Sequence, residues 1–370
     1  MKKKFYGMLA AVLIASCICV PQVEVQAEDV YDDSDWNDSD WNDSWYDNDV
    51  TPIPDLTNVT IDKTSQTGYT QKADNYYYGT QMPTYRFTLQ NTPCTLNDYD
   101  DGVLFSTESS NSSIDVYASL ENNVISLTPD AAGKTTITIT INSKTFQVTI
   151  NTIAVELPNS LLLSTKQKTQ IRAKGVSTIK WKSTNPSVAT ISGNGTVCAK
   201  KTGNTILVGT IGDVQMGCVV SVVSPARKRA VQKARQIAKT CTYSQPKRMQ
   251  EKFYDCSSLV WKSYHKNGVN FGAASYAPVA ADMGKWCAQH KKLIKGGLSQ
   301  SNVQNMKLNP GDVMFETGQK NGRYKGIYHV EMITGYIFYG FNENGTANLG
   351  IQWATGNEKY YPMGQMVGRP

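Results

Sequence analysis

The hydrophobic periodicity of this chain changes once, at Ser224-Pro225. From residue 56 to 222, short runs of alternating apolar and polar residues are separated by Asn, Gly, Ser and Pro, a pattern typical of β-sandwiches. After the break, residues 226 to 240 repeat apolar side chains at helical spacing, and further helical and strand-like runs follow. Since 370 residues exceed one ordinary domain, we expect a multidomain chain with N-terminal all-β sandwiches and a C-terminal α+β domain at residues 226–370.

The second half of the β region has the clearer strand pattern, with a hairpin turn at Asn194-Gly195. The run that starts at Trp181 reads Trp-Lys-Ser-Thr-Asn-Pro-Ser-Val-Ala-Thr-Ile-Ser-Gly-Asn-Gly-Thr-Val and resembles the bacterial immunoglobulin-like repeat of surface proteins. The resemblance implies one Ig-like domain at residues 153–223 and a diverged copy at residues 56–152. Such domains act as spacers or binding modules, and neither contains a recognisable catalytic group of residues.

The N-terminus has the parts of a secretory signal. Lys2–Lys4 supply positive charge, Phe5–Val20 is apolar, and a small residue ends the segment at Ala27. We predict a signal peptide at residues 1–27, cleaved after Ala27, with a lipoprotein site that acylates Cys17 as the alternative. No other run is long and apolar enough to cross a bilayer, so we expect a secreted protein, extracellular or cell-wall associated, without a transmembrane segment in its mature form.

Charge is distributed unevenly along the chain. Residues 28–55 carry eleven acidic side chains and no Lys or Arg, and we predict that this Trp- and Asp-rich segment is disordered. Residues 225–370 hold 21 Lys and Arg against 8 Asp and Glu. In an exported protein, the expected partner of so basic a domain is an anionic cell-wall or membrane surface rather than nucleic acid.

Six cysteines remain after Cys17 and Cys19 of the signal segment. Their spacing is wide and irregular, without a Cys-x-x-Cys pair, and the chain has only three histidines, so we expect no metal site. Cys198 and Cys218 lie in neighbouring strand-like runs, where they could form a disulfide or remain two buried thiols.

One cysteine lies where an extended segment turns into a run with helical spacing. Cys256 follows Phe253–Asp255 and precedes the apolar residues of Leu259–Tyr264, while Ser257 and Ser258 could cap the helix. A helix N-terminus carries a partial positive charge that favours the thiolate and lowers a cysteine pKa. Cys256 is therefore a candidate nucleophile, and a small buried hydrophobic residue is the alternative.

A thiol nucleophile needs a base, and His329 is the best placed of the three histidines. It lies in the strand-like run Tyr328–Ile333, on the same face as Glu331. One of the other two lies too far along the Cys256 helix to reach its sulfur, and the other lies in a Lys-rich stretch.

Three short motifs follow one another in the C-terminal region. They are Asp-Cys-Ser-Ser-Leu-Val from Asp255, Leu-x-Pro-Gly-Asp-Val-x-Phe from Leu308, and His329-Val330. In this order they resemble the NlpC-type cell-wall cysteine peptidase family, which is papain-like in fold. The resemblance implies a papain-like domain that hydrolyses peptidoglycan stem peptides, typically between γ-D-glutamate and a diamino acid, with no metal or organic cofactor. It also implies that Cys256 is the nucleophile and His329 the general base.

The same resemblance suggests roles for further residues. Asp255 and Ser257 line the site and help to place the stem peptide, Asp255 by accepting from a free amino group. Tyr243 corresponds to a tyrosine near the oxyanion position, although its usual Tyr-x-Trp-Gly-Gly setting is absent. Gln352, on a later strand, corresponds to the third catalytic residue, and Glu331 remains the alternative.

Two other functions fit the same sequence. One is an amidase or acyltransferase on a papain-like frame. The other is a non-catalytic wall-binding or adhesive surface protein whose last domain has lost activity. In each case we expect a monomer.

Overall fold

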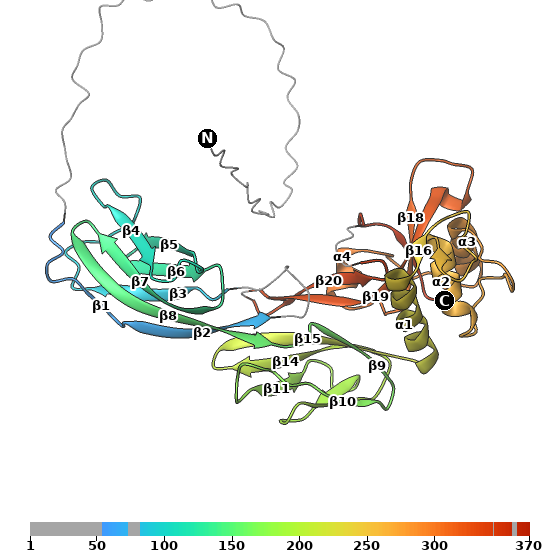
Figure 1. The fold of residues 1–370 in the computed structure, drawn as a ribbon, viewed down its shortest axis with the longest axis horizontal. Helices are drawn as coiled ribbons and strands as arrows, with labels where there is room; N and C mark the ends of the chain where they lie inside the picture. Colours follow the sequence, from blue (N-terminus) through green and yellow to red (C-terminus); the bar gives the residue numbers. More distant parts are fainter. Residues whose placement is uncertain (1–53, 73–81, 343, 357–360) are drawn as a thin grey trace, which may run out of the picture. The chain divides into compact units, whose positions relative to one another are not determined.

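The structure is a computed structural model that describes residues 54–72, 82–342, 344–356 and 361–370. Along the chain, two β-sandwiches are followed by a domain of helices and an antiparallel sheet (Figure 1). The predicted signal peptide, and all but the last two residues of the predicted acidic segment, lie outside the described residues. Within those residues, no helix has the length and apolar character that crossing a bilayer requires.

The first sandwich consists of two four-stranded sheets, ordered β1-β3-β6-β5 and β2-β8-β7-β4. Its strands are β1 (Thr60–Ile61), β2 (Ser65–Lys72), β3 (Tyr85–Gln90), β4 (Phe105–Ser109), β5 (Val116–Glu121), β6 (Val124–Pro129), β7 (Gly133–Ile141) and β8 (Lys144–Glu156). The alternating sequence explains the core. In β7, Ile137, Ile139 and Ile141 are fully buried, whereas the threonines between them are not. Each buried isoleucine contributes about 1.5–3 kcal/mol.

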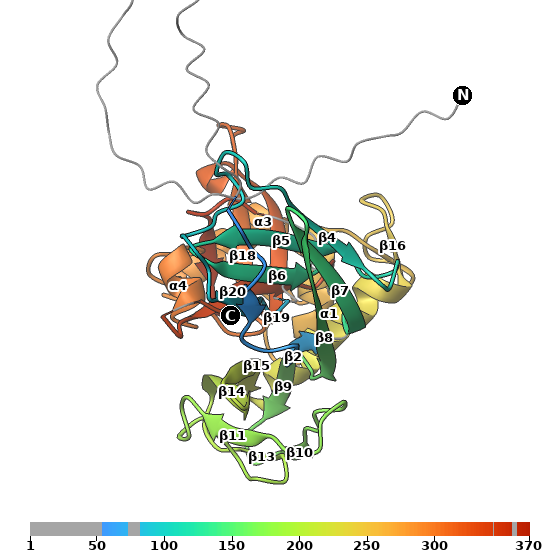
Figure 2. The same ribbon diagram turned by 90° about the vertical axis from the view of Figure 1, so that its left-hand side faces the viewer.

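The second sandwich has sheets ordered β10-β13-β12 and β11-β14-β15-β9 (Figures 1 and 2). Its strands are β9 (Ser160–Ser164), β10 (Lys168–Gln170), β11 (Lys180–Ser183), β12 (Ala189–Ile191), β13 (Thr196–Ala199), β14 (Gly203–Ile211) and β15 (Val214–Val223). The predicted turn at Asn194-Gly195 joins β12 to β13. Gly195 has a φ of 83°, and a Cβ there would lie 2.1 Å from the carbonyl oxygen of Ile171. Only glycine fits this turn.

The two sandwiches share one topology. In each, an early strand pairs in parallel with the last strand, β2 with β8 and β9 with β15. The last strand pairs antiparallel with the strand before it, which is β7 or β14. On its other edge, that strand pairs antiparallel with β4 or β11. The opposite sheets, β3-β6-β5 and β10-β13-β12, correspond as well. The two sandwiches therefore have the same strand order, and the prediction that residues 56–152 are a diverged copy of residues 153–223 stays a prediction.

Cys198 and Cys218 do not form the disulfide that was one of the two alternatives for them. Cys198 lies in β13 and is half-buried, because its neighbours Val197 and Ala199 face the core. Cys218 lies in β15, in the opposite sheet, and is fully buried. Both thiols are free, and burial raises the pKa of Cys218. The buried-thiol alternative is therefore right for Cys218 alone.

The C-terminal domain combines helices with an antiparallel sheet ordered β20-β19-β18-β21, as expected for an α+β domain. Its elements are α1 (Pro225–Thr240), β16 (Thr242–Tyr243), β17 (Phe253–Tyr254), α2 (Cys256–His265), α3 (Ala280–Gln289), α4 (Gln300–Gln304), β18 (Val313–Thr317), the 3-10 turn η1 (Tyr324–Gly326), β19 (Ile327–Phe341), β20 (Ala347–Trp353) and β21 (Met366–Gly368). The predicted basic helix is α1. The Ser224 hydroxyl caps it by accepting from the Arg227 N–H at 3.2 Å, and Pro225 occupies its first position.

One core joins helices α1, α2 and α3 to strands β18 and β19. Its buried side chains include Ala230, Val231, Ala234, Leu259, Val260, Met283, Phe315, Val330 and Met332. Through this core α2 contacts β19, and the two elements carry the predicted nucleophile and base.

Candidate active site

Cys256 is the first residue of α2, as the sequence predicts. The helix is capped by Asp255, whose carboxylate accepts from the Ser258 N–H at 2.7 Å. The Ser258 hydroxyl in turn accepts from the Asp255 N–H at 2.9 Å. This reciprocal capping box orients the turn that carries the thiol. Capping by Ser258 is therefore confirmed, whereas Ser257 does not cap the helix.

A buried ion pair lies beside this turn. Nη1 of Arg248 is 3.3 Å from Oδ2 of Asp255, and Nη2 donates to the Ser257 hydroxyl at 3.0 Å. Nη2 also donates to the carbonyl oxygens of Ala277 and Pro278. Asp255 and Ser257 are only 5% and 2% exposed, so they hold the turn in place instead of lining an open site. This differs from the expected role of Asp255, whose carboxylate is already occupied and does not face solvent.

The Cys256 sulfur lies where α2 meets β19. The backbone N–H of Val330 and the hydroxyl of Tyr243 both donate hydrogen bonds to it. Burial raises the Cys256 pKa, and these hydrogen bonds, which favour the thiolate, do not compensate for it. The expected lowering of the pKa by the helix N-terminus is therefore wrong. Near neutral pH the sulfur carries a proton that a base must remove.

Tyr243 reaches Cys256 from a short parallel strand pair. β16 pairs with β17 so that Tyr243 lies opposite Tyr254, and the two rings meet edge to face at 5.5 Å. Tyr243 is 52% exposed, and its hydroxyl also accepts from the backbone N–H of Cys256. The structure thus places a half-exposed phenol against the thiol.

His329 lies on β19, directly before Val330. Because the Val330 N–H donates to the Cys256 sulfur, the predicted nucleophile lies against the residue next to the predicted base, although the two segments are far apart in sequence. His329 is partly exposed and lies opposite Glu316 of β18. The site is therefore reachable from solvent on the histidine side.

Tyr361 and Glu331 extend the site behind the imidazole. The Tyr361 hydroxyl oxygen is 3.3 Å from Nε2 of His329, and the two rings stack at 6.0 Å with an angle of 19°. Glu331 is 1% exposed, and its carboxylate accepts from the hydroxyls of Thr355 and Tyr361. Burial, and then the Glu331 carboxylate, raise the pKa of Tyr361.

Gln352 is not brought to His329. In the β19–β20 pairing, Gln352 lies opposite Gly335, six residues along β19 from the histidine, or roughly 20 Å at the rise of a strand. Its amide oxygen accepts from Arg235 of α1 at 2.9 Å. The prediction that Gln352 orients the imidazole is corrected by this register, whereas the alternative, Glu331, does lie near the imidazole.

The other two histidines each stack on a tryptophan one helical turn earlier. His265 lies 4.1 Å from Trp261 between ring centres, at the opposite end of α2 from the thiol. His290 lies 4.3 Å from Trp286, just after α3. Both rings are packed against apolar surface, in agreement with the exclusion of these two residues as bases.

Sequence reasoning missed Arg248 and Tyr361. Arg248 follows Lys247, so the pair resembled ordinary basic surface charge, although Arg248 is only 9% exposed. Tyr361 belongs to no motif, and no periodic pattern surrounds it. Only the contact with His329 identifies it.

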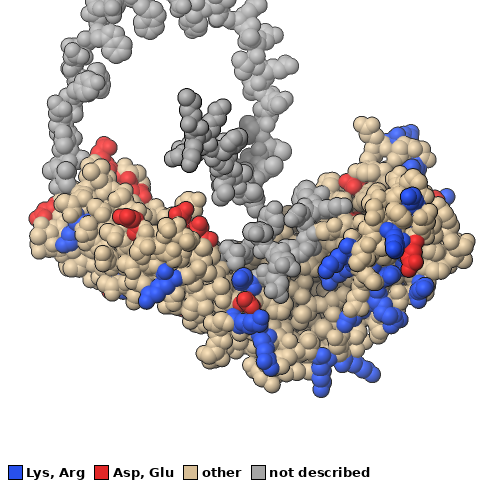
Figure 3. All heavy atoms as spheres, viewed as in Figure 1, with Lys and Arg blue, Asp and Glu red and all other residues tan. Residues whose placement is uncertain are grey.

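The balance of acidic and basic side chains differs between the first sandwich and the C-terminal domain. Residues 56–152 contain nine acidic and five basic side chains, the opposite balance to residues 225–370. On the face drawn in Figure 3, acidic side chains gather over the first sandwich and basic side chains over the C-terminal domain. The candidate active site is thus carried by the basic module.

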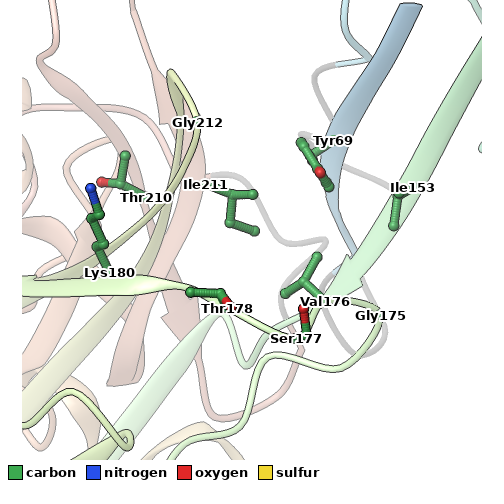
Figure 4. Close-up of a pocket in the computed structure, with 10 residues that line it drawn as sticks. All are labelled: Tyr69, Ile153, Gly175, Val176, Ser177, Thr178, Lys180, Thr210, Ile211 and Gly212. Carbon is green, nitrogen blue, oxygen red and sulfur yellow. The ribbon is translucent and has the colours of Figure 1, made fainter.

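A surface hollow of about 440 Å³ is lined by residues of the β modules (Figure 4). The lining residues are Tyr69, Ile153, Gly175, Val176, Ser177, Thr178, Lys180, Thr210, Ile211 and Gly212. None of these ten carries a thiol, an imidazole or a carboxylate. The hollow therefore lacks the thiol and imidazole that the sequence motifs place around Cys256.

Comparison with known proteins identifies part of the chain. No curated protein sequence matches it. It is similar in structure to a C-terminal 282-residue intimin fragment in complex with the translocated intimin receptor (16% identity, 64% of this chain, 84% of that chain, TM-score 0.28). It is also similar to invasin, a bacterial integrin-binding protein (13%, 46% and 40%, TM-score 0.28), and to domains 4 and 5 of the S-layer protein SbsC (18%, 32% and 77%, TM-score 0.17). These TM-scores are too low to transfer any property to this chain. Residues 161–222 match the family described as bacterial Ig-like domain (group 2), so the second sandwich of this multidomain, mostly β chain is a bacterial Ig-like domain.

Proposed function

We propose that the C-terminal domain is a papain-like cysteine peptidase of the NlpC type that hydrolyses peptidoglycan stem peptides, typically between γ-D-glutamate and a diamino acid. One observation carries the proposal: the Cys256 sulfur, at the start of α2, accepts from the backbone N–H of Val330, the neighbour of His329. A thiol at a helix start with an imidazole nearby is the arrangement that papain-like catalysis uses. The three ordered sequence motifs give independent support.

The mechanism starts from a neutral thiol, since burial raises the Cys256 pKa. His329 takes the thiol proton as the sulfur attacks the scissile carbonyl carbon. The amide C–N bond breaks, and the imidazolium returns its proton to the leaving amine, which leaves a thioester on Cys256. Water, deprotonated by His329, then hydrolyses the thioester and restores the thiol.

The negative charge that develops on the carbonyl oxygen needs hydrogen-bond donors close to the sulfur. The backbone N–H of Ser257 and the Tyr243 hydroxyl both lie against the thiol. Tyr243 has a raised pKa, chiefly because of its desolvation and then because of Cys256, so it keeps its proton and can donate. These donors form the oxyanion hole of the proposed reaction.

The rest of the chain fits a role outside the cell. An excess of Lys and Arg in residues 225–370 favours an anionic cell-wall surface as the partner of the catalytic domain. In this proposal the protein is exported, and the two sandwiches carry the peptidase to the wall or space it from another surface.

Digestion of purified muropeptides by the full chain tests the proposal. The parent should release products with new amino termini, and Cys256→Ala should release none. Cys241→Ala is the matched control, because Cys241 is a free, partly buried thiol that contacts the carbonyl oxygen of Glu251 and not the site. A parent without products, or a fully active Cys256→Ala variant, would contradict the peptidase.

The same digest separates hydrolysis from acyl transfer. With an added amine acceptor, a peptidase yields free carboxyl termini, whereas an acyltransferase yields products with the mass of the amine attached. Products in which only an amide nitrogen is lost would indicate an amidase on the same thiol.

A second function is favoured by the bacterial Ig-like match at residues 161–222. In this alternative the chain is a wall-binding or adhesive surface protein and its last domain has no catalytic role. Equal binding of the parent and Cys256→Ala to isolated sacculi, with no new amino termini from the parent, would establish the alternative in place of the peptidase.

A further inference from the structure

Two polar groups, the Tyr361 hydroxyl and the Glu331 carboxylate, line up behind the imidazole of His329. Its Nε2 is 3.3 Å from the Tyr361 hydroxyl oxygen, and that hydroxyl also contacts the Glu331 carboxylate. The tyrosine is 8% exposed, and its ring meets Trp353 edge to face at 4.8 Å. Packing on both faces of this ring holds the hydroxyl in place.

The direction of the hydrogen bonds follows from the carboxylate. Glu331 is an acceptor when it is ionised, so the Tyr361 O–H points to it. A lone pair of the same oxygen is then left for His329, which must donate from Nε2–H. A neutral imidazole that carries its hydrogen on Nε2 has an unprotonated Nδ1, which acts as an acceptor.

We propose that Tyr361 and Glu331 are positioning residues that hold His329 in the Nε2–H tautomer and leave Nδ1 to accept the thiol proton of Cys256. The inference rests on the proposed function, because it assigns His329 the role of base. During the reaction the proton moves from sulfur to Nδ1, while Tyr361 keeps its own proton and Glu331 remains ionised.

The buried charge also stabilises the imidazolium that forms. Glu331 is almost inaccessible to solvent and is separated from His329 by one hydroxyl. Glu316 lies opposite His329 on β18, and Cys256 lies against the neighbouring Val330. The Glu316 carboxylate accepts from the Tyr328 hydroxyl, whereas the Glu331 carboxylate accepts from Tyr361, whose hydroxyl contacts the imidazole.

Nitrogen-15 NMR of the histidine side chains tests this role without any substrate. The full chain has only three histidines, so a His329→Gln spectrum assigns the signal. In the parent, His329 should show the Nε2–H tautomer. Tyr361→Phe should mix the tautomers, and Glu331→Gln should lower the His329 pKa by about one unit or more, since an opposite charge is lost.

Tyr336→Phe is the matched control. It also removes a fully buried hydroxyl from this sheet, but that hydroxyl bonds the backbone of Leu308 and not the histidine. The control should leave the tautomer and pKa of His329 unchanged. Muropeptide hydrolysis should fall at least tenfold in Tyr361→Phe, with the acid limb of its pH profile displaced to lower pH.

The outcomes separate this inference from the proposed function. If Tyr361→Phe and Glu331→Gln both keep the parent tautomer and pKa of His329, the positioning role is overturned even when the parent is an active peptidase. If the parent has no activity but both variants shift His329, the positioning role stands and the proposed reaction fails. Glu331→Gln preserves side-chain shape, so it answers the question even when Tyr361→Phe fails to fold.

Discussion

At the scale of single residues, opposing effects meet on the Cys256 thiol. Burial disfavours the thiolate, while the Val330 N–H and the Tyr243 hydroxyl stabilise it. The balance leaves a protonated sulfur whose reactivity depends on its neighbours. Tyr243 and His329 therefore become the residues at which single changes are most informative.

Replacement of Tyr243 by Phe should lower kcat for muropeptide hydrolysis about tenfold with little change in KM. The phenol donates to the developing oxyanion, while the backbone N–H of Ser257 remains in place. Steady-state kinetics checks this result. The control is Tyr276→Phe, since Tyr276 is also exposed but packs on Arg248 and not on the thiol. An equal loss in both variants would contradict the role of Tyr243.

A second buried thiol predicts the response of stability to alkaline pH. Burial raises the pKa of Cys287 to about 12, against about 8.5 in an unfolded chain. Between these values the folded state binds more protons, so the free energy of unfolding is highest below about pH 8.5 and falls as pH rises, by up to about 1.4 kcal/mol per pH unit.

Urea unfolding of the parent and Cys287→Ala from about pH 8 to pH 11 measures this slope. The free energy of unfolding of Cys287→Ala should fall less steeply with rising pH than that of the parent. The variant starts from a lower free energy of unfolding because the substitution leaves a cavity. Cys94→Ala, which removes an exposed thiol, should keep the slope of the parent. Identical slopes in all three proteins would show that Cys287 does not contribute.

At the scale of elements, one buried carboxylate ties the C-terminal domain together. Asp312, in the turn before β18, is fully buried. It pairs with Arg227 of α1 at 3.1 Å and with Arg369, just after β21, at 2.8 Å. It also accepts from the Asn309 N–H at 2.7 Å. The first helix, the central sheet and the end of the chain therefore share one charged centre.

Neutralising this centre should destabilise the domain strongly. Asp312→Asn leaves two guanidinium groups without their carboxylate, and loss of one member of a buried pair costs about 3–5 kcal/mol. We expect a cost near about 3 kcal/mol, because the side chain of Arg369 is 39% exposed and water partly screens its charge. The free energy of unfolding in urea checks this value. Asp282→Asn, at an exposed position in the first turn of α3, should cost less than about 1 kcal/mol. Similar costs for both would refute a central role for Asp312.

At the scale of the whole molecule, the modules differ in charge. The first sandwich is mildly acidic and the C-terminal domain is basic (Figure 3). Charge of one sign on the C-terminal domain raises the local concentration of an anionic partner near the candidate site. In the proposed function the substrate lies within an anionic wall, and the basic charge of the C-terminal domain attracts the protein to that wall.

Binding of the full chain to isolated sacculi should therefore weaken as salt is raised from about 0.1 M to about 1 M. Over that range the Debye length falls from about 10 Å to about 3 Å, which screens exposed charges from each other. Co-sedimentation measures the bound fraction. Sacculi stripped of their anionic polymers should bind weakly at every salt concentration. Binding that salt leaves unchanged would exclude a contact led by charge.

Local patterns predicted much of the fold and half of the site. The turn at Asn194-Gly195, the start of α1 after Ser224 and the start of α2 at Cys256 were all predictable, because capping and turn residues act within a few positions of one another. The strand that carries His329 was predictable from alternation as well.

The partners of His329 were not predictable in this way. Alternation tells which face of a strand a side chain occupies, but not which residue of the next strand lies opposite. In the β19–β20 pairing Gln352 falls beside Gly335, far along the strand from His329. Tyr361 enters the site from outside the paired strands, where no periodic pattern applies.

By itself, the sequence determined the order of the modules, the strand alternation of the sandwiches and the capped helix that begins with Cys256, since each of these depends on interactions between near neighbours. Only the tertiary structure decided that Arg248 forms an ion pair with Asp255. It also decided that Tyr361 and Glu331, and not Gln352, lie behind His329. The contact between Tyr361 and His329 joins residues 32 positions apart, and no helix or strand spans the interval from Arg248 to Asp255. The geometry of these contacts exists only after helices and sheet have packed into one core.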